Sequence, residues 1–351
     1  MKSNTPLIGI LTSSKSDGSI AGNGPLFIAL QKKLISLNGI SFVFIPEGME
    51  VDCINGYSYS PEENCWKKKS FPFPDLVYNR IPFRTKEQEE TSQLLFSRLR
   101  EKNIPFFNPC FIDKYELYQL LKTDNTLRDH LPETILVKEK NQLLAFLKRF
   151  GGIYLKPTQS SKGKGIIRVR MEGPSEILLE GINKQEIYPS FTQFWEEWNE
   201  ELLKKRYAGQ EEIESAEYEG KRFDFRILAH AHYDNYTLTG VGIRHSQEQE
   251  ITTHIPSGGK LLPYHLFQSS EHDEFFQTII SIIGKSLSEQ FGFFGEFTID
   301  AGVSKSGRYY IYEVNSKPMS FDEVDIEERK IENLCRLFLQ LINAYPQEKN
   351  A

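Results

Sequence analysis

The chain has 351 residues, of which 39% are hydrophobic and 26% charged, and its formal net charge is −6. This length supports two or three folding units, and the composition is that of a globular rather than a disordered protein. Acidic and basic residues are interleaved and no apolar run reaches the roughly 20 residues that cross a bilayer, so we expect neither nucleic acid nor a membrane as the main partner. The four cysteines form no CxxC pair, which favours a reduced, cytoplasmic protein.

The N-terminal part of the chain predicts a parallel α/β unit. Leu7–Thr12 and Ile40–Ile45 are short apolar runs, and between them Pro25 opens a helix with leucines at helical spacing. A strand, a helix and a second strand in this order imply a parallel sheet. A further strand is expected at Leu76–Asn79, whereas residues 51–74 are predicted to be irregular.

Two arginines follow the last of these strands. Arg80 and Arg84 lie beyond its carboxyl end, where open α/β sheets bind their ligands, so they are candidates to face an anionic substrate. The alternative is that both are solvated loop arginines. Tyr57 and Trp66 are further candidates for substrate contact. A charged amphipathic helix over Glu87–Lys102 is expected to end this unit.

A boundary near residues 109–113 divides the chain into residues 1–110, 111–209 and 210–351. The second part begins with a helix capped by Asp113 and carrying Lys114, and Asn141 is expected to cap another helix. Strands Ile153–Pro157 and Ile166–Arg170 flank a loop rich in serine, glycine and lysine. Such a tip can close over polyphosphate with its amide groups and ammonium groups, and a flexible hairpin without a ligand is the alternative.

The end of the second part and the whole of the third combine strands and helices. An amphipathic helix over Ser190–Tyr207 leads into an acidic segment, Gln210–Glu219, that crosses between subdomains. Strand Phe223–His230 places Asp224 and Arg226 on one face, and a partner strand ends in Arg244. Helices are expected over His272–Gln290 and Ile326–Ala344, with a glycine-rich corner at Ile255–Lys260 before them.

A hairpin over Glu296–Val314 carries the clearest sign of a metal site. A turn at Lys305–Arg308 pairs Asp300 with Glu313, and Glu313 shares its face with Asn315 because side chains alternate along a strand. Two carboxylates and an amide oxygen are hard ligands that suit Mg²⁺ together with substrate phosphates. The alternative is an edge hairpin with solvated acids.

The order of these segments resembles that of ATP-grasp enzymes, and most closely their YheC/YheD-type, endospore coat-associated branch. The resemblance extends over essentially the whole chain. It includes Pro72–Arg84, Asn108–Leu121 and Phe291–Gly302. It implies an N-terminal parallel α/β domain followed by a two-subdomain ATP-grasp fold, so that the fold class is α/β and α+β.

The resemblance also implies roles for individual residues. ATP would lie between the two subdomains, with its phosphates near two lysines and the loop tip, its adenine at the hinge, and Mg²⁺ on the hairpin. The implied nucleotide-binding residues are Lys114, Lys156, Ser161, Lys164, Gly165, Gln210, Glu211, Glu212 and Ile213. The implied metal ligands are Asp300, Glu313 and Asn315, and the implied catalytic residues are Arg226, Arg244 and His254. Many relatives have Asn where this chain has His254, which bears on the acceptor chemistry.

The implied activity is that of a carboxylate–amine ligase that uses ATP and Mg²⁺ and works through an acyl phosphate. Its expected partners are a small-molecule or peptide carboxylate and an amine acceptor, with spore coat proteins as further partners and a cytoplasmic, spore-associated location. The alternative is a spore coat-associated structural or assembly protein on an ATP-grasp scaffold with vestigial nucleotide binding. A kinase-like use of the fold is a third reading.

Overall fold

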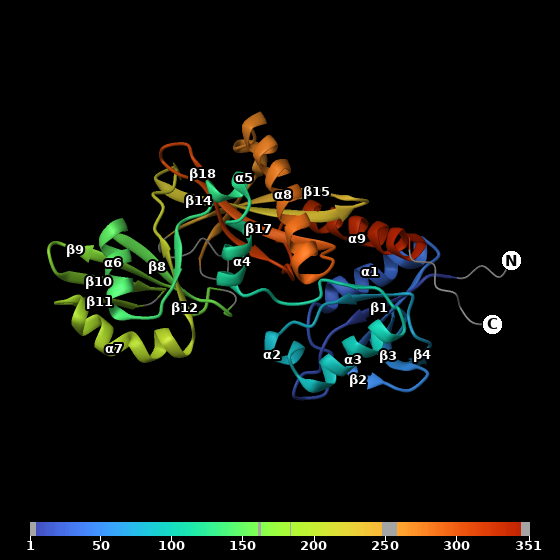
Figure 1. The fold of residues 1–351 in the computed structure, drawn as a ribbon. Coiled ribbons are helices and arrows are strands. Elements are labelled where there is room, and N and C mark those ends of the chain that lie inside the picture. Colours follow the sequence, from blue (N-terminus) through green and yellow to red (C-terminus); the bar gives the residue numbers. More distant parts are fainter. Residues whose placement is uncertain (1–4, 161–162, 183, 248–257, 345–351) are drawn as a thin grey trace.

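The computed structural model describes residues 5–160, 163–182, 184–247 and 258–344. The described strands form three sheets, one in each successive part of the chain, and Figure 1 shows them as three groups that are blue to cyan, green, and yellow to red. The helices that cover these sheets are α1 (Gly24–Ser36), α2 (Arg84–Glu87), α3 (Glu90–Glu101), α4 (Lys114–Leu121), α5 (Asn125–Arg128), α6 (Lys140–Phe150), α7 (Phe191–Lys204), α8 (Ser270–Phe291) and α9 (Val324–Ala344).

The first sheet has the strand order β4-β3-β2-β1-β5-β6. Its strands are β1 (Leu7–Leu11), β2 (Ile40–Met49), β3 (Ile54–Ser60), β4 (Cys65–Phe71), β5 (Leu76–Asn79) and β6 (Phe106–Phe107). The pairs β1–β2, β1–β5 and β5–β6 are parallel, as the α/β pattern predicts. The prediction that residues 51–74 are irregular was wrong, because β3 and β4 form an antiparallel hairpin that extends the sheet. The turn between them contains Asn64 with a positive φ of 51°, a conformation that Asn tolerates better than most residues.

The second sheet contains the predicted loop tip. Its order is β11-β10-β9-β8-β12-β7, from β7 (Thr134–Leu136), β8 (Gly152–Pro157), β9 (Ile167–Glu172), β10 (Glu176–Gly181), β11 (Lys184–Tyr188) and β12 (Tyr207–Glu211). Strands β8 and β9 pair antiparallel on either side of the tip. Two helix predictions need correction here. Asn141 does not cap α6, which begins at Lys140 without a side-chain cap, and the helix predicted to reach Tyr207 ends at Lys204 because Tyr207 starts β12.

The third sheet is antiparallel and contains the hairpin that was predicted to bind a metal. Its order is β16-β15-β14-β17-β18, from β14 (Lys221–His232), β15 (Asn235–His245), β16 (Lys260–Leu262), β17 (Glu296–Val303) and β18 (Tyr309–Asn315), with β13 (Glu217–Tyr218) paired to β14. Helices α8 and α9 pack on it, and α9 also lies beside α1 of the first part (Figure 1). In the first part, α3 (Glu90–Glu101) confirms the helix predicted over Glu87–Lys102, although Glu87 itself ends the short helix α2.

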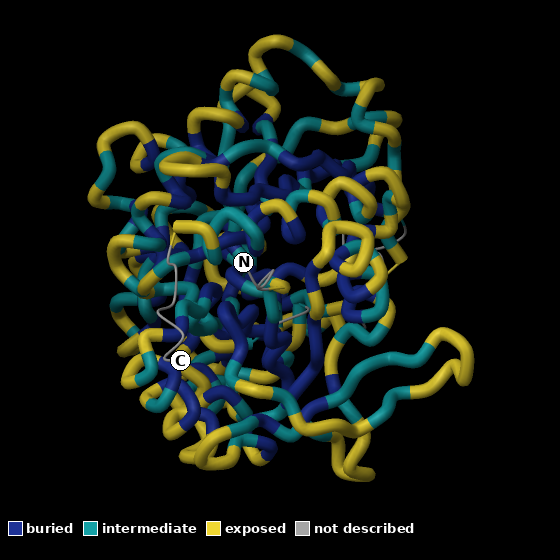
Figure 2. Tube along the Cα trace, turned by 90° about the vertical axis from the view of Figure 1, so that its right-hand side faces the viewer, coloured by how far each residue is buried: buried dark blue, intermediate teal, exposed yellow. Residues whose placement is uncertain are grey.

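The three sheets do not each have a separate hydrophobic core. The middle part has a core of its own around Leu155, Phe194 and Tyr207. By contrast, Tyr78 and Phe107 of the first part share one cluster with residues of the third sheet and of α9. In Figure 2 these buried segments run through the interior while the projecting turns are exposed. The first and third parts are therefore joined by common burial, and α4 and α5 at the start of the middle part contribute Leu117, Tyr118 and Leu127 to the same cluster, whereas the second sheet has its own core.

No helix in the described ranges combines the length and apolar character that a membrane crossing needs.

Candidate active site

The predicted metal hairpin is formed by β17 and β18. Asp300 lies directly opposite Glu313, and Thr298 lies opposite Asn315, which confirms the predicted pairing of the two acids. The predicted turn was wrong by one residue, because Ser304 N donates to Arg308 O at 2.8 Å. A β-bulge that leaves Tyr312 without a partner restores the register before Asp300 is reached.

The three predicted ligands converge at one point of this sheet. Asn315 Nδ2 donates to Asp300 Oδ2 at 3.3 Å, and the Glu313 carboxylate forms an ion pair with Lys114. Asp300 Oδ1 also receives a bond of 3.3 Å from Arg226. Among the residues that the structure describes, no group of three or more His, Cys, Asp or Glu is arranged to hold a metal. The donor set is thus two carboxylates and an amide, which fits Mg²⁺ with further oxygen ligands from a phosphate.

The two carboxylates differ in their electrostatic surroundings. Burial raises the pKa of Asp300, and the nearby charge of Glu313 acts in the same direction while Arg226 opposes it. Burial also disfavours ionisation of Glu313, but the positive charges of Lys114 and Lys156 outweigh it, so the pKa of Glu313 is lowered. Two acids this close repel each other when both are ionised. A divalent cation between them would remove that repulsion.

Two lysines face the acids from different elements. Asp113 caps α4 by accepting from Tyr115 N at 2.9 Å, and this places Lys114 on the first turn next to Glu313. Lys156 comes from β8, and its Nζ donates to Gln210 Oε1 of β12 at 2.5 Å. Burial lowers the pKa of Lys156 to about 8, although Glu313 opposes the shift.

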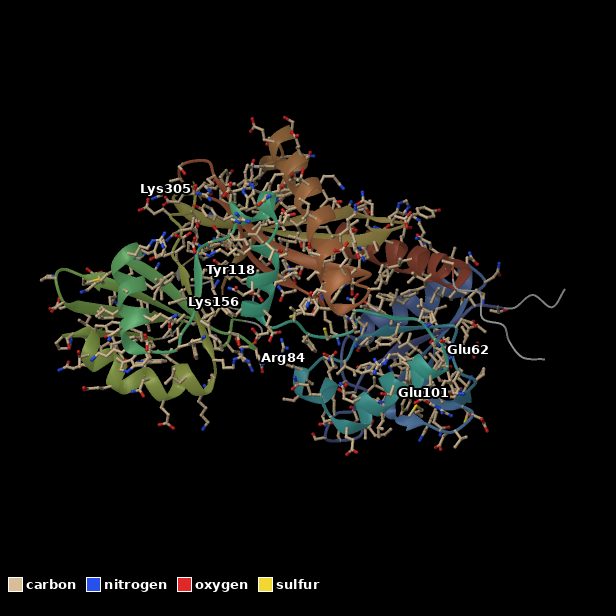
Figure 3. The ribbon with its side chains drawn as sticks, in the orientation of Figure 1. Glu62, Arg84, Glu101, Tyr118, Lys156 and Lys305 are labelled. Carbon is tan, nitrogen blue, oxygen red and sulfur yellow. The ribbon has the colours of Figure 1, made fainter. Side chains whose placement is uncertain are left out.

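A cleft of about 240 Å³ joins these features. Among its lining residues are eight of the predicted site residues, Lys156, Gln210, Glu211, Ile213, Arg226, Arg244, Asp300 and Glu313. Lys114 lines a smaller adjoining cavity together with Lys156 and Tyr118, and Figure 3 shows the latter two where the middle sheet faces α4. Ser161 and His254 lie outside the described residues.

The predicted hinge residues are placed unequally. Glu211 lines the cleft, and its backbone N–H is already bound to Glu133 O at 2.9 Å. Glu212 lies outside the cleft, since its carboxylate receives a bond of 2.7 Å from Arg170 and its N–H is bound to Gly152 O at 3.1 Å. The backbone N–H groups of Glu211 and Glu212 are therefore already paired, and Gln210 and Ile213 are the other predicted hinge residues that line the cleft.

The loop tip contributes to the cleft through one glycine. Gly163 is among the lining residues, whereas Lys164 is exposed and Gly165 lies beside Pro157. Gly165 has a φ of +76°, and an added Cβ would come within 3.0 Å of both Pro157 and Tyr207. The turn that returns the chain to β9 therefore requires glycine there.

The two predicted catalytic arginines have partners in the protein. Arg226 bonds to Asp300, as described above. Arg244 is held by the Glu323 carboxylate through bonds of 2.6 and 3.2 Å. Both guanidinium groups lie over the Phe321 ring, at 5.4 and 5.8 Å from its centre. The arginines are thus fixed in orientation by a segment for which the sequence suggested no role.

Both N-terminal arginines have partners within the protein. Arg80 is buried and bonds to Glu296 at 3.0 Å and to Pro318 O at 2.7 Å. Arg84 donates to the carbonyl groups of Phe111 and Ile112 at 3.0 and 2.8 Å. Arg80 is therefore not a solvated loop arginine, Arg84 is half-buried, and neither lines the cleft. No described residue of the N-terminal sheet, Tyr57 and Trp66 included, is among the cleft's lining residues.

Sequence reasoning gave no site role to several of the residues that line the cleft. Arg222 donates to Tyr154 Oη at 3.1 Å and to Asp224 at 3.0 Å, and all three lie in the cleft wall. The alternation that places Asp224 and Arg226 on one face also predicts Arg222, two residues earlier. Tyr312 gives no such signal, because strict alternation assigns it to the face opposite Glu313 and only the bulge brings it into the wall.

Solved structures of other proteins share this fold. The D-alanyl-alanine synthetase A of Vibrio cholerae has a TM-score of 0.58 and 12% identity, covering 97% of this chain and 99% of its own. The ATP-grasp ligase PsnB, complexed with precursor peptide PsnA2 and AMPPNP, has a TM-score of 0.53 and 13% identity, covering 95% and 98%. At these identities the likeness establishes the fold, which confirms the predicted ATP-grasp class.

Sequence comparison gives a narrower assignment. The endospore coat-associated protein YheD of Bacillus subtilis is 28% identical over 307 residues, covering 82% of this chain and 67% of that protein. The sequence model of the YheC/D-like ATP-grasp family matches residues 103–343, which include every predicted nucleotide-binding, metal-binding and catalytic residue. This chain therefore belongs to the YheC/D-like ATP-grasp family.

Proposed function

We propose that the protein is a carboxylate–amine ligase that uses ATP and Mg²⁺. The observation that carries this proposal is the pair of carboxylates, Asp300 and Glu313, beside the ammonium group of Lys156 in the cleft and that of Lys114 in the adjoining cavity. A site for phosphoryl transfer needs carboxylates that bind a metal ion and, beside them, positively charged groups that bind the phosphate oxygens. The fold shared with ATP-grasp ligases supports the same reading.

Each element of the cleft has a proposed part. Asp300, Glu313 and Asn315 hold Mg²⁺, which when bound neutralises phosphate charge. Lys114 and Lys156 bind phosphate oxygens as point charges. The remaining proposed nucleotide contacts are the main chain of Gln210, Glu211, Glu212 and Ile213 at the hinge and Ser161, Lys164 and Gly165 at the loop tip.

The proposed reaction has two steps that balance. A substrate carboxylate oxygen bonds to the γ-phosphorus of ATP as the bond to ADP breaks, which gives an acyl phosphate. The amine nitrogen then bonds to the acyl carbon, phosphate leaves and the amine loses a proton. In this scheme Arg226 and Arg244 orient the transferred group and the substrate carboxylate, and His254 is proposed to contact the intermediate.

The substrates are proposed only as classes, a small-molecule or peptide carboxylate and an amine. PsnB was solved with a precursor peptide, which makes peptides a reasonable first set to test. Spore coat proteins are further proposed partners, because the related YheD is described as endospore coat-associated. On the same ground we propose a cytoplasmic, spore-associated location.

The test is phosphate release from ATP and Mg²⁺ with pooled amino acids and peptides as carboxylates, with and without added amines. We expect release that rises with one carboxylate pool, together with an amide product detected by mass spectrometry. Release that responds to no pool, with nucleotide binding intact, would contradict ligase activity and favour the scaffold reading. A phosphorylated product that never becomes an amide would instead indicate kinase-like use of the fold.

We also expect nucleotide binding to weaken as the pH rises through 8. Burial lowers the pKa of Lys156 to about 8, so its ammonium is charged below that pH and neutral above it. Lys114 and Arg222 act in the same direction on this group, and Glu313 and Asp224 oppose them. Because phosphates bind the charged form, the dissociation constant for an ATP analogue should rise between pH 7.5 and 9.

The matched variant for this prediction is Lys156→Arg, since an arginine remains charged throughout that range. Its pH profile should be flatter than that of the wild type, whatever its affinity. Equal profiles for the two proteins would show that Lys156 is not the group responsible.

A further inference from the structure

One segment links the metal hairpin to the rest of the molecule. We call residues Ser316–Glu323 the strap. It begins directly after Asn315 and ends directly before Val324, the first residue of α9, and Met319, Ser320 and Asp322 line the cleft. Any shift of its first residues therefore moves a proposed metal ligand and part of the cleft wall together.

The start of the strap is held by Asn108. This residue is fully buried and has a positive φ of 55°. Its Nδ2 donates to Ser316 O at 2.6 Å and to Glu296 O at 2.9 Å, while its Oδ1 accepts from Gly295 N at 2.9 Å. One amide thus joins the beginning of β17 to the end of β18, at the open end of the metal hairpin.

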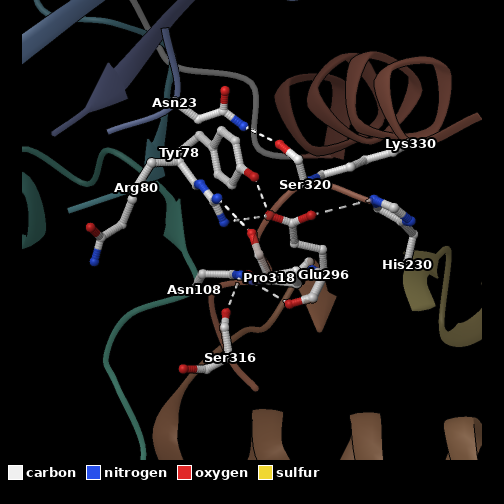
Figure 4. A network of polar contacts seen from close by, with 12 residues as sticks. Asn23, Tyr78, Arg80, Asn108, His230, Glu296, Ser316, Pro318, Ser320 and Lys330 are labelled. Carbon is white, nitrogen blue, oxygen red and sulfur yellow. Dashed lines mark hydrogen bonds and ion pairs between the residues drawn. The ribbon is translucent and has the colours of Figure 1, made fainter. Parts of the chain in front are cut away.

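Arg80 holds the same end of the hairpin from the side of the N-terminal sheet. Its Nη1 lies 3.0 Å from Glu296 Oε1, and its Nη2 donates to Pro318 O at 2.7 Å (Figure 4). Lys317, between these contacts, forms a buried ion pair with Glu87. Each of the first three strap residues is therefore held by a different residue from the part of the chain before residue 110.

Glu296 gives Arg80 a fixed anchor. Its carboxylate is fully buried and also bonds to Tyr78 Oη. Burial disfavours its charge, but the positive charges of Lys330 and Arg80 outweigh that effect and lower the pKa of Glu296. His230 Nε2 lies 3.7 Å from Glu296 Oε2, on the side away from the arginine. The guanidinium group is thus confined between a buried carboxylate and a strap carbonyl.

The far end of the strap is fixed in a different way. Glu323 grips Arg244 bidentately, and its carboxylate lies over Gly242 of β15. A Cβ on Gly242 would come 2.4 Å from Glu323 Oε1. The strap therefore has anchors at both ends, with its cleft-lining residues between them.

We propose that Arg80 is a positioning residue for the metal site, because its two-pronged hold on Glu296 and Pro318 sets the spacing of the hairpin's open end and with it the place of Asn315. The proposal rests on the proposed function, since it assumes that Asn315 binds Mg²⁺. Arg80 itself touches no substrate. Lysine, with a single ammonium group, cannot span both partners in the same way.

The test compares Arg80→Lys with the wild type by titrating AMPPNP at several Mg²⁺ concentrations. Supporting residues of metal ligands typically alter metal affinity by about 10- to 100-fold, so we expect the Mg²⁺ concentration for half-maximal binding to rise about tenfold. Binding of metal-free AMPPNP should change by less than about twofold, because the strap contributes no lysine to the phosphates. If Arg80 had a purely structural role, its replacement would lower the melting temperature, but the Mg²⁺ requirement would not rise separately from the binding of metal-free AMPPNP.

Arg308→Lys is the matched control. Arg308 also donates to a main-chain carbonyl, Asp129 O at 2.9 Å, but it lies at the turn end of the same hairpin. Its replacement should leave the Mg²⁺ requirement at the wild-type value. An equal rise in both variants would overturn a specific role for the open end.

Two further outcomes are decisive. An Arg80→Lys protein with the wild-type Mg²⁺ requirement overturns the positioning role while leaving the proposed function in place. If AMPPNP binding to the wild type does not respond to Mg²⁺, both the positioning role and the proposed function are overturned.

If Arg80→Lys does not fold, Glu296→Gln provides the test, because it keeps the shape of the side chain that anchors Arg80 and removes its charge. The Mg²⁺ requirement should then rise, and a wild-type value would overturn the proposal.

Discussion

Replacing Glu313 with glutamine is expected to reduce Mg²⁺-dependent ATP turnover by about 100-fold or more. Glu313 lies opposite Asp300 in the hairpin, and it is the one proposed ligand that also pairs with Lys114. Glutamine keeps the size of the side chain but removes the charge that attracts both cations. Losing one preorganised electrostatic group of this kind typically costs about 10²- to 10³-fold in rate.

The measurement is initial-rate phosphate release across a Mg²⁺ series, with thermal unfolding to show that the variant is folded. Glu217→Gln is the control, because Glu217 is a partly exposed acid whose ion-pair partner, Lys305, lies at the hairpin turn. It should behave as wild type. Turnover in Glu313→Gln within about threefold of wild type would remove Glu313 from the metal site.

Replacing Lys156 with methionine is expected to weaken ATP-analogue binding by about 10- to 100-fold without loss of stability. Charge-assisted bonds to phosphate are among the stronger polar contacts, so their removal has a large effect on affinity. In the protein without nucleotide, however, burial works against the Lys156 charge, as its lowered pKa of about 8 shows. A methionine of similar length avoids that cost, although it gives up the bond to Gln210.

In Lys156→Met the affinity for the ATP analogue, measured by calorimetry, should therefore fall, while the melting temperature should equal or exceed that of the wild type. Lys184→Met is the control, since Lys184 lies in the same sheet on the edge strand β11 and pairs with Glu186 at 3.0 Å. It should change neither quantity. Parallel loss of binding and stability in Lys156→Met would mean that this lysine supports the fold rather than the nucleotide.

The order of elements was largely predictable from the sequence. Leu76–Asn79 was predicted with its observed bounds, and α1, α8 and α9 were each located to within a few residues, because their apolar residues repeat at the period of the helix. The hairpin of β3 and β4 was missed since its two strands carry few long apolar side chains, and it joins the sheet only through the pairing of β3 with β2.

Within the cleft, too, features that depend on local spacing were predictable, and features that depend on packing were not. The pairing of Asp300 with Glu313 could be read from local spacing, since both residues lie in one hairpin. The place of Tyr312 could not be predicted, because a bulge reverses the alternation on which the prediction relied. The partner of Lys114 was equally out of reach, as Glu313 is 199 residues away and only the packing of α4 against the third sheet brings the two together.

By itself, then, the sequence determined the elements, the family resemblance and the identity of the charged residues, all of which depend on local patterns. The tertiary structure alone decided what those charges face. Arg80 follows a strand of the first sheet, yet it bonds to Glu296 and to Pro318 in the third part of the chain. Such contacts arise when buried charges find partners as separate segments pack into a common core, and no periodicity along the chain records that choice.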